Sequence, residues 1–441
     1  MKRRTFLTFC SSTGLSPVIG SWAASPNETP NIASVGVGGK GWADSQGAAA
    51  FANMQAFCDV NTGRTKRKGG YFLATEKWPK ANKYADWREM LEKEGETLDG
   101  ITVTTPDHMH APITMTALRM GIACYTQKPL TRTIYESRMI SAAAKEAGVA
   151  TQMGNQHHNG RTYKTLVNLI RNGAVGKIKE VHCWSDRPVW PQGIARPDGT
   201  SEVPETLDWN LWLGGAPDRP FHDAYQPFNW RGWFDFGAGA LGDMGAHIID
   251  PPVWALELGP ALTVSYEGPE TMPETFPKAE RIHYVFKGTK LTKGEQLALT
   301  WHDGDKRPDL TACGLPADFK LAGGGSLYIG ESGTIVVGHG SSALPAIFQD
   351  GKSAGIDFEV IDGVNHYEQW INAIRGEGET TSNFAYAGPL TETVLLGTIV
   401  CRFPGQTLEW NPGAMKFNNS AEATGLVSQP YRKGWEVEGL G

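Results

Sequence analysis

The residues best suited to do chemistry are an aspartate and a histidine four positions apart, Asp243 and His247, in a run rich in small residues. If this run is helical, the spacing places both side chains on one face. Hydride transfer at a carbinol carbon needs a group that takes up or returns the hydroxyl proton, and histidine does so near neutral pH. We therefore predict that His247 is a general acid–base group and that Asp243 orients the substrate or the imidazole. The alternative is a helical turn with a capping aspartate and a surface histidine.

A glycine pattern near the start of the chain predicts a site for a dinucleotide. Gly36, Gly38 and Gly41 satisfy G-x-G-x-x-G, with Gly39 among them, directly after the apolar, β-prone segment 32–37. The glycines permit a tight turn and let the backbone approach a pyrophosphate, while the N-terminus of the following helix offers free N–H groups. A glycine-rich turn without a ligand is the alternative.

An acidic residue at the end of the next predicted strand, 55–60, completes the dinucleotide pattern. Asp59 would accept hydrogen bonds from the ribose hydroxyls and repel a 2′-phosphate, which favours NAD over NADP. Arg64 and Lys66 lie nearby and keep NADP as an alternative. The small residues 43–52 between the two strands predict a helix packed closely on a sheet.

Strand and helix patterns then alternate up to residue 153. The predicted strands are 99–103, 123–126 and 150–153, and the predicted helices are 84–91, 111–120 and 134–147. Repeated β–α units predict a parallel, doubly wound sheet whose ligands lie beyond the carboxyl ends of the strands. The loops 104–110 and 127–130 belong to that edge.

The second half has a different pattern. A helix over 163–172 and a strand over 179–184 lead into a long insert rich in tryptophan, tyrosine and phenylalanine. Further strands are predicted at 297–301 and 326–329, and further helices at 366–375 and 388–398. Pro251 and Pro252 disfavour helical geometry at Asp250, which predicts a break there. The tail from residue 406 onward has no predicted element.

Taken together, these motifs resemble the glucose–fructose oxidoreductase/inositol dehydrogenase/MocA (Gfo/Idh/MocA) family. The resemblance rests on the glycine fingerprint, 105–111, Lys128-Pro129 and 242–250, which occur in the family's order. It implies an α/β protein with an N-terminal Rossmann domain and a C-terminal α/β domain built on an open, mostly antiparallel sheet. The outer face of that sheet commonly forms an oligomer interface. Members mostly oxidise or reduce a secondary hydroxyl of a sugar or polyol.

The resemblance also assigns roles to residues. Lys128, Asp243 and His247 match the catalytic positions, and Lys128 would hydrogen-bond the reacting oxygen and stabilise charge on it. Members typically carry Glu-Lys-Pro where this chain has Gln127-Lys128-Pro129. The predicted cofactor-binding residues are Gly36, Gly38, Gly39, Gly41, Asp59, Thr105, Pro106, His108, His110 and Lys128. His108 and His110 could instead cap the next helix.

A polar cluster at the predicted domain junction, 154–160, is the other candidate site. Asn155, His157 and His158 could contact sugar hydroxyls or form a structural junction. Two adjacent histidines rarely point at one ion, so we predict no metal site. The remaining predicted substrate contacts are Tyr163, Trp230 and Arg231.

The length, charge and N-terminus bound the class of protein. A chain of 441 residues predicts two domains, which we place at 30–154 (NAD(P)-binding) and 155–441 (substrate and oligomerisation). The net charge of −6 argues against nucleic acid.

Paired arginines followed by a weakly apolar stretch in residues 1–24 predict a twin-arginine signal and export to the periplasm; a basic tail is the alternative. Beyond the signal no stretch approaches the roughly 20 apolar residues of a membrane span.

Export constrains the function, because the periplasm offers no obvious pool of free nicotinamide cofactor. A folded protein can carry its cofactor out, and redox balance must then be kept within the site. We predict an NAD(P)-dependent oxidoreductase with a tightly bound cofactor that acts on a secondary hydroxyl of a sugar or glycoside, as a homo-oligomer (dimer or tetramer). The alternatives are a redox-neutral glycoside hydrolase or lyase, which oxidises transiently before elimination and hydration, and a non-catalytic sugar-binding protein.

Overall fold

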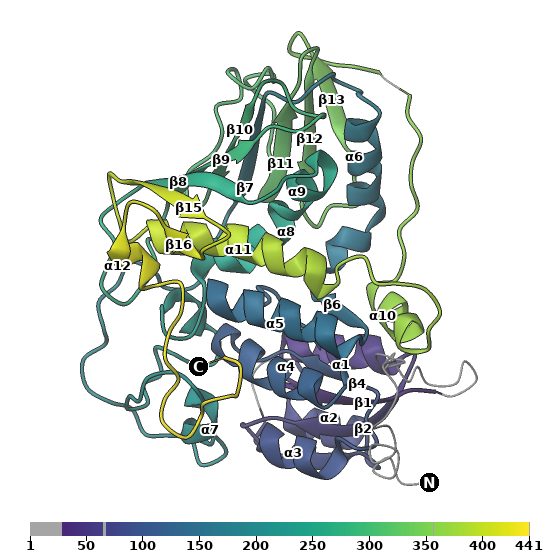
Figure 1. Ribbon diagram of the computed structural model, residues 1–441, viewed down its shortest axis with the longest axis vertical. Helices are drawn as coiled ribbons and strands as arrows, with labels where there is room; N and C mark the ends of the chain where they lie inside the picture. The colour runs from purple at the N-terminus through teal and green to yellow at the C-terminus, as the bar shows by residue number, and fades with distance from the viewer. Residues whose placement is uncertain (1–28, 65–67, 356, 441) are drawn as a thin grey trace, which may run out of the picture.

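The computed structural model describes residues 29–64, 68–355 and 357–440, which form two sheets with helices between and around them (Figure 1). The predicted signal, 1–24, and Lys66 lie outside the described residues. The first sheet has the order β3-β2-β1-β4-β5-β6, and all its pairings are parallel. Its strands are β1 (Asn31–Val35), β2 (Asn53–Cys58), β3 (Asn82–Tyr84), β4 (Gly100–Val103), β5 (Ala123–Thr126) and β6 (Thr151–Met153). The predicted doubly wound parallel sheet is confirmed.

Helices cover both faces of this sheet, so its central strands are buried throughout. They are α1 (Lys40–Ala49), α2 (Tyr71–Lys77), α3 (Trp87–Glu94), α4 (His110–Arg119) and α5 (Ile134–Ala147). Local sequence sets the ends of α5: Thr133 and Glu136 form a capping box, and Gly148 ends the helix in the left-handed conformation.

The second sheet has ten strands in the order β14-β13-β12-β11-β7-β10-β9-β8-β15-β16. Only β7 and β10 pair in parallel, so the predicted, mostly antiparallel sheet is also confirmed. Its strands are β7 (Glu180–Ser185), β8 (Ala261–Glu267), β9 (Arg281–Lys287), β10 (Gln296–His302), β11 (Gly324–Ile329), β12 (Thr334–Gly338), β13 (Ala346–Gln349), β14 (Lys352–Ser353), β15 (Thr407–Asn411) and β16 (Lys416–Phe417). The unassigned tail thus supplies β15, which pairs with β8.

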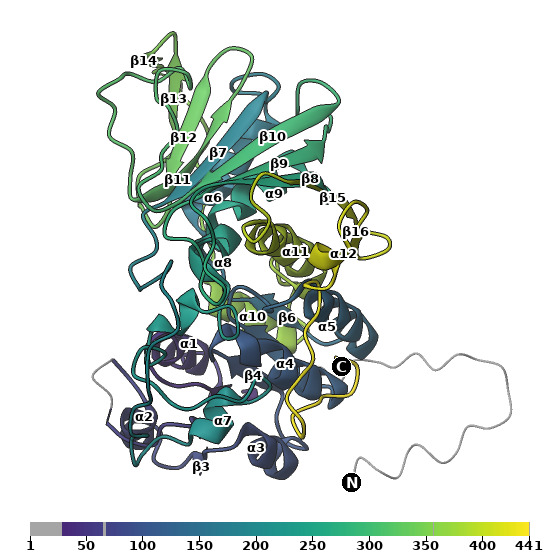
Figure 2. The same cartoon turned by 90° about the vertical axis from the view of Figure 1, so that its left-hand side faces the viewer.

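Helices cover one face of the second sheet and separate it from the first (Figures 1 and 2). These are α6 (Arg161–Arg171), α8 (Gly239–Ile248), α9 (Asp250–Leu256) and α11 (Phe384–Val400). The break predicted at Asp250 lies one residue earlier, at Ile249, because α8 ends at Ile248 and Asp250 is already the first residue of α9, with the two prolines in its first turn. Along β9 buried and partly exposed positions alternate, because the other face of the sheet is open there.

Three segments of the second half return to the first sheet. The helix α10 (His366–Ile374) buries Trp370 and Ile371 in the same apolar cluster as Phe57. The insert 186–238 descends from β7 to α7 (Trp209–Leu213), which lies beside the first sheet in both views. The tail after α12 (Ala421–Thr424) then crosses the insert, where Arg432 Nε donates to the Gly214 carbonyl at 3.0 Å. No helix in these described segments, or elsewhere in the described chain, is long and apolar enough to span a membrane.

Candidate active site

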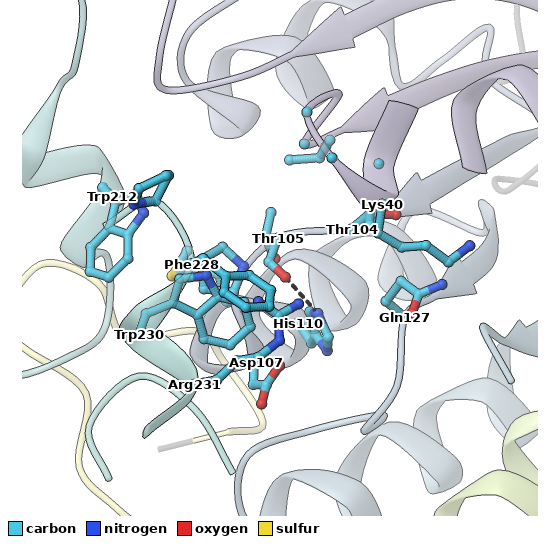
Figure 3. A pocket seen from close by; sticks show the side chains of 18 of the residues that line it. Lys40, Thr104, Thr105, Asp107, His110, Gln127, Trp212, Phe228, Trp230 and Arg231 are labelled. Atoms are coloured by element: carbon cyan, nitrogen blue, oxygen red, sulfur yellow. Dashed lines mark hydrogen bonds between the residues drawn. The ribbon is translucent and has the colours of Figure 1, made fainter. Parts of the chain in front are cut away.

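A pocket of about 460 Å³ lies where the carboxyl ends of the parallel strands meet the insert and α8 (Figure 3). The loops after β1, β2, β4 and β5 form one wall. Aromatic residues of the insert form the opposite wall, and Asp243 and His247 reach it from α8. Lys40 and Gln127 lie together at one end in Figure 3, away from Trp230 and Arg231.

Side chains would obstruct the turn of the glycine loop. Its backbone is therefore bare, and a dinucleotide can approach it. Gly36 has a φ of 78°, and a Cβ there would lie 2.3 Å from the Thr104 carbonyl oxygen. A Cβ on Gly41 would lie 2.1 Å from the Gly36 carbonyl oxygen, so this glycine lets α1 pack closely on the strand. Gly39 has a φ of 58° and immediately precedes α1 with open space around its Cβ position, where a ligand can approach the backbone.

Asp59 lies beyond the end of β2, on the pocket wall, as predicted. Its two carboxylate oxygens accept hydrogen bonds from the Val37 and Asn61 N–H groups, both at 3.0 Å. These bonds fix the carboxylate beside the glycine loop. Burial raises its pKa, and the two N–H donors oppose that shift.

The loop after β4 contributes Thr105, Pro106 and His110 to the pocket wall. The two ring nitrogens of His110 lie 3.0 Å from the Thr105 carbonyl oxygen, shown dashed in Figure 3, and 2.8 Å from the Pro129 carbonyl oxygen. The histidine therefore ties the loop after β4 to the loop that carries Lys128. Burial lowers its pKa to about 4, so the ring is neutral near pH 7.

His108 is placed differently from the prediction of a cofactor contact. It is buried behind the pocket, and its ring nitrogens lie 3.2 Å from the Phe236 carbonyl oxygen and 3.0 Å from that of Trp212. The neutral ring has one N–H, which donates to one of these two carbonyls and holds the insert against the β4 loop. We correct its role to that of a structural residue.

Lys128 and Asp243, far apart in sequence, form an ion pair in the pocket. Lys128 Nζ donates to the Asp243 carbonyl oxygen and to its Oδ1, each at 2.7 Å. Arg231 Nε donates to the same Oδ1 at 3.3 Å, and Arg187 Nε lies 4.0 Å from Oδ2. Burial alone would raise the pKa of Asp243, but the charges of Lys128, Arg231 and Arg187 outweigh it and hold the pKa at about 2.

His247 lies one turn further along α8, on the pocket wall. Its Nδ1 is buried without a hydrogen-bond partner among the described residues. Burial, followed by the neighbouring His339 and Lys128, lowers its pKa well below the usual range. The ring is therefore neutral near pH 7 and able to accept a proton.

A cluster of aromatic and imidazole rings extends from His247 toward the surface. The ring centroids of His247 and His339 are 4.9 Å apart, and those of His339 and His157 are 4.5 Å apart. The Tyr163 hydroxyl lies 2.9 Å from His339 Nδ1. Burial lowers the pKa of His339 to about 3. The predicted residues His157 and Tyr163 thus lie beside the pocket, joined by a histidine that the sequence did not single out.

Asn155 and His158 do not reach the pocket. The prediction that they contact sugar hydroxyls is therefore corrected. Asn155 Nδ2 donates to Asp250 Oδ2 at 3.1 Å, and His158 Nδ1 lies 3.0 Å from both carboxylate oxygens. Trp254 stacks on the His158 ring at 4.1 Å. Both residues are buried, so they form the structural junction that was the alternative interpretation.

Several residues that line the pocket were not among the predicted site residues. They are Lys40, Asp107, Arg187, Trp190, Trp212 and Phe228. Trp230 and Arg231, which we predict to contact the substrate, also line the wall. Among the described residues no group of three or more histidine, cysteine, aspartate or glutamate side chains is arranged to hold a metal ion.

Comparison with known proteins agrees with this geometry. Residues 31–155 match the Gfo/Idh/MocA oxidoreductase family, NAD-binding Rossmann fold, and residues 182–300 match the C-terminal alpha/beta domain of the same family. The chain belongs to the Gfo/Idh/MocA family of oxidoreductases, and its first domain is an NAD-binding Rossmann fold.

Individual relatives are distant. A levoglucosan dehydrogenase of Pseudarthrobacter phenanthrenivorans is 26% identical over 38% of this chain and 35% of its own length. An alpha-N-acetylgalactosaminidase of Shewanella oneidensis is 23% identical over 34% of each chain. This chain therefore spans about a third of the length of these relatives. The WlbA dehydrogenase of Bordetella pertussis, solved with NADH and UDP-GlcNAcA, is 17% identical with a TM-score of 0.62, covering 87% of this chain and 99% of that one.

Proposed function

We propose that this protein is an NAD-dependent oxidoreductase that acts on a secondary hydroxyl of a sugar or glycoside. The observation that carries the proposal is the meeting of Lys128, Asp243 and His247 in the same pocket as the glycine loop. A non-catalytic sugar-binding protein would not need a charged lysine and an unpartnered imidazole beside a dinucleotide cradle.

The roles follow from the hydrogen bonds. When bound, the nicotinamide ring supplies the acceptor for the hydride of the carbinol carbon. His247 is neutral and takes up the hydroxyl proton. Two N–H groups of the Lys128 ammonium donate to oxygens of Asp243, which are its only acceptors among the described residues. The third N–H is left for the reacting oxygen. Asp243 stays ionised and holds Lys128 in place.

Asp59 supports NAD as the cofactor, because a carboxylate at this position binds ribose hydroxyls and repels a 2′-phosphate. Retention of the cofactor is supported by the insert, which lines the pocket and is hydrogen-bonded to the loop after β2. Asp208 N–H donates to the Val60 carbonyl at 3.0 Å, and Thr62 N–H donates to the Thr206 carbonyl at 2.9 Å. We propose that the folded protein is exported by the twin-arginine route with the dinucleotide already bound, and acts in the periplasm as a homo-oligomer.

Redox-neutral glycoside cleavage is the second candidate, and the ring cluster beside His247 favours it. Elimination of an aglycone needs a base besides the one that serves the oxidised hydroxyl. His157 and His339 supply neutral imidazoles within one or two ring contacts of His247. The glycosidase among the relatives is in keeping with this route.

The first test is to purify the full chain, denature it, and measure released dinucleotide by mass spectrometry. We expect near-stoichiometric NAD. The untreated protein is then mixed with free sugars and aryl glycosides while absorbance at 340 nm and aglycone release are followed. Reduction of the bound cofactor supports the oxidoreductase, and aglycone release without net reduction supports the glycosidase. Neither bound dinucleotide nor binding of added NAD(H) or NADP(H) would refute both.

A further inference from the structure

The part of the pocket around Asp243 carries more positive than negative charge. Lys128, Arg187 and Arg231 all surround that one carboxylate. The other acid at this end, Asp107, is buried, which raises its pKa to about 7 despite the opposing charges of Arg231 and Lys128. Arg187 is also paired with Asp186, and with a pKa of about 7 Asp107 is partly ionised near pH 7, so the three cations exceed the nearby carboxylates by a small margin. An anionic sugar would balance that remaining charge, whereas a neutral one would not.

Arg231 is held with its terminal donors available. Its Nε is committed to Asp243, while its two Nη atoms donate to no described residue, and the side chain keeps 19% of its surface exposed. The guanidinium carbon lies 4.1 Å from the Trp230 ring centroid and 4.6 Å from that of Phe228. Figure 3 shows these three side chains together in the pocket. Stacking on aromatic faces fixes the guanidinium plane and leaves its edge for a ligand.

Arg187 is the second arginine near this carboxylate, with its Nε 4.0 Å from Asp243 Oδ2. It lies two residues beyond the end of β7, its side chain is 31% exposed, and it lines the pocket. One Nη donates to Asp186 at 2.6 Å, outside the pocket lining. Beside it, Val189 is 62% exposed and also lines the pocket. Arg187 therefore stands near the opening of the pocket, where it can contact a ligand that also reaches Arg231.

We propose that the substrate is an acidic sugar, a uronic acid or its glycoside, whose carboxylate is bound by Arg231 with Arg187 beside it. A planar guanidinium edge binds a planar carboxylate through two parallel hydrogen bonds, a geometry that a sugar hydroxyl does not reproduce. The oxidation of a ring hydroxyl rests on the proposed function, but the carboxylate contact does not, because binding alone reports it.

The test compares sugars that differ only in this group. The full chain with its retained cofactor is titrated with methyl β-D-glucopyranosiduronate and methyl β-D-glucopyranoside, and with the matched galacto pair, by calorimetry. Glucose 6-phosphate is the phosphate probe. We expect each uronate to bind at least about tenfold more tightly than its neutral partner. Arg231→Gln and, independently, Arg187→Gln should remove that preference, while Arg161→Gln, on the exposed side of α6, should keep it.

Equal affinities within both pairs, or a preference that survives both pocket variants, would overturn the proposal. Tighter binding of glucose 6-phosphate than of either uronate would overturn the assignment to a carboxylate. Absorbance at 340 nm, followed on the same samples, separates this result from the proposed function. A uronate preference without any reduction of bound cofactor would support the anion site and contradict the oxidoreductase.

Discussion

Gln127 Nε2 donates a hydrogen bond to Asp44 Oδ2 at 3.0 Å, joining the catalytic loop to the first helix after the glycine turn. Asp44 is fully buried and also accepts from the Thr104 and Tyr367 hydroxyls, at 2.9 and 2.7 Å. The carboxylate of Asp44 is already buried beside residue 127. The Gln127 amide can donate a hydrogen bond to it, which a glutamate could not.

We predict that Gln127→Glu destabilises the protein. The change removes a donor to Asp44 and places a second carboxylate beside it, which should cost about 1–3 kcal/mol of unfolding free energy. The loss should be larger at about pH 8 than at about pH 5, because one of the two carboxylates can be protonated at the lower pH. Thermal unfolding at both pH values measures it, with the exposed Gln406→Glu as control. Equal unfolding temperatures for the variant and the parent would contradict this account.

Lys128→Met should lower turnover by about 10²–10³-fold, since it removes the donor to the reacting oxygen. Lys128 is also a predicted cofactor contact, so bound dinucleotide should fall, but only in part, because the glycine loop and Asp59 are untouched. The pKa of Asp243 should rise from about 2 when its nearest cation is lost. Single-turnover absorbance at 340 nm gives the rate, and the exposed Lys177→Met is the matched control. Turnover within about threefold of the parent would exclude Lys128 as a catalytic residue.

Thr206→Val should speed dissociation of the dinucleotide. The Thr206 hydroxyl donates to Asn61 Oδ1 at 3.1 Å, one of the contacts that hold the insert to the loop after β2. Loss of one partly exposed hydrogen bond of about 1 kcal/mol predicts a rate roughly fivefold higher. Competition with excess labelled NAD measures the exchange, and Thr200→Val elsewhere in the insert serves as control. An unchanged rate would mean that this contact does not retain the cofactor.

Acid should weaken the fold through its buried histidines. Burial lowers the pKa of His108, His302 and His366 to about 3 in each case. Their usual pKa is about 6.5, so between these values the unfolded chain binds more protons and stability falls as the pH falls. Protonation of each of these histidines in the unfolded chain lowers the free energy of unfolding by up to about 2 kcal/mol at about pH 5. Urea unfolding at about pH 7 and about pH 5 measures the slope.

His366→Gln should reduce that slope, because the glutamine cannot be protonated. The control is His283→Gln, whose side chain is 42% exposed and which should leave the slope nearly unchanged. Stability that is constant or rises on acidification would show that these rings are not held neutral.

The amino-acid sequence alone determined the parts of this protein that depend on neighbours along the chain. The glycine turn, the acid at the end of β2, the β–α alternation and the helical spacing of Asp243 and His247 are short-range patterns. These patterns can be recognised in the sequence because steric limits on φ and ψ and the period of each element act between near neighbours. The helix predicted at 134–147 has the bounds of α5, whose capping residues are also local.

Only the tertiary structure decided which distant groups share the site. His339 follows β12 and Arg187 follows β7, yet both come to the surroundings of His247 and Asp243 when the second sheet packs over α8. The same packing directed Asn155 and His158 to Asp250 and turned His108 behind the pocket. Side-chain direction at a junction depends on burial and on partners brought from elsewhere, because a buried polar group must find a hydrogen bond wherever the fold supplies one.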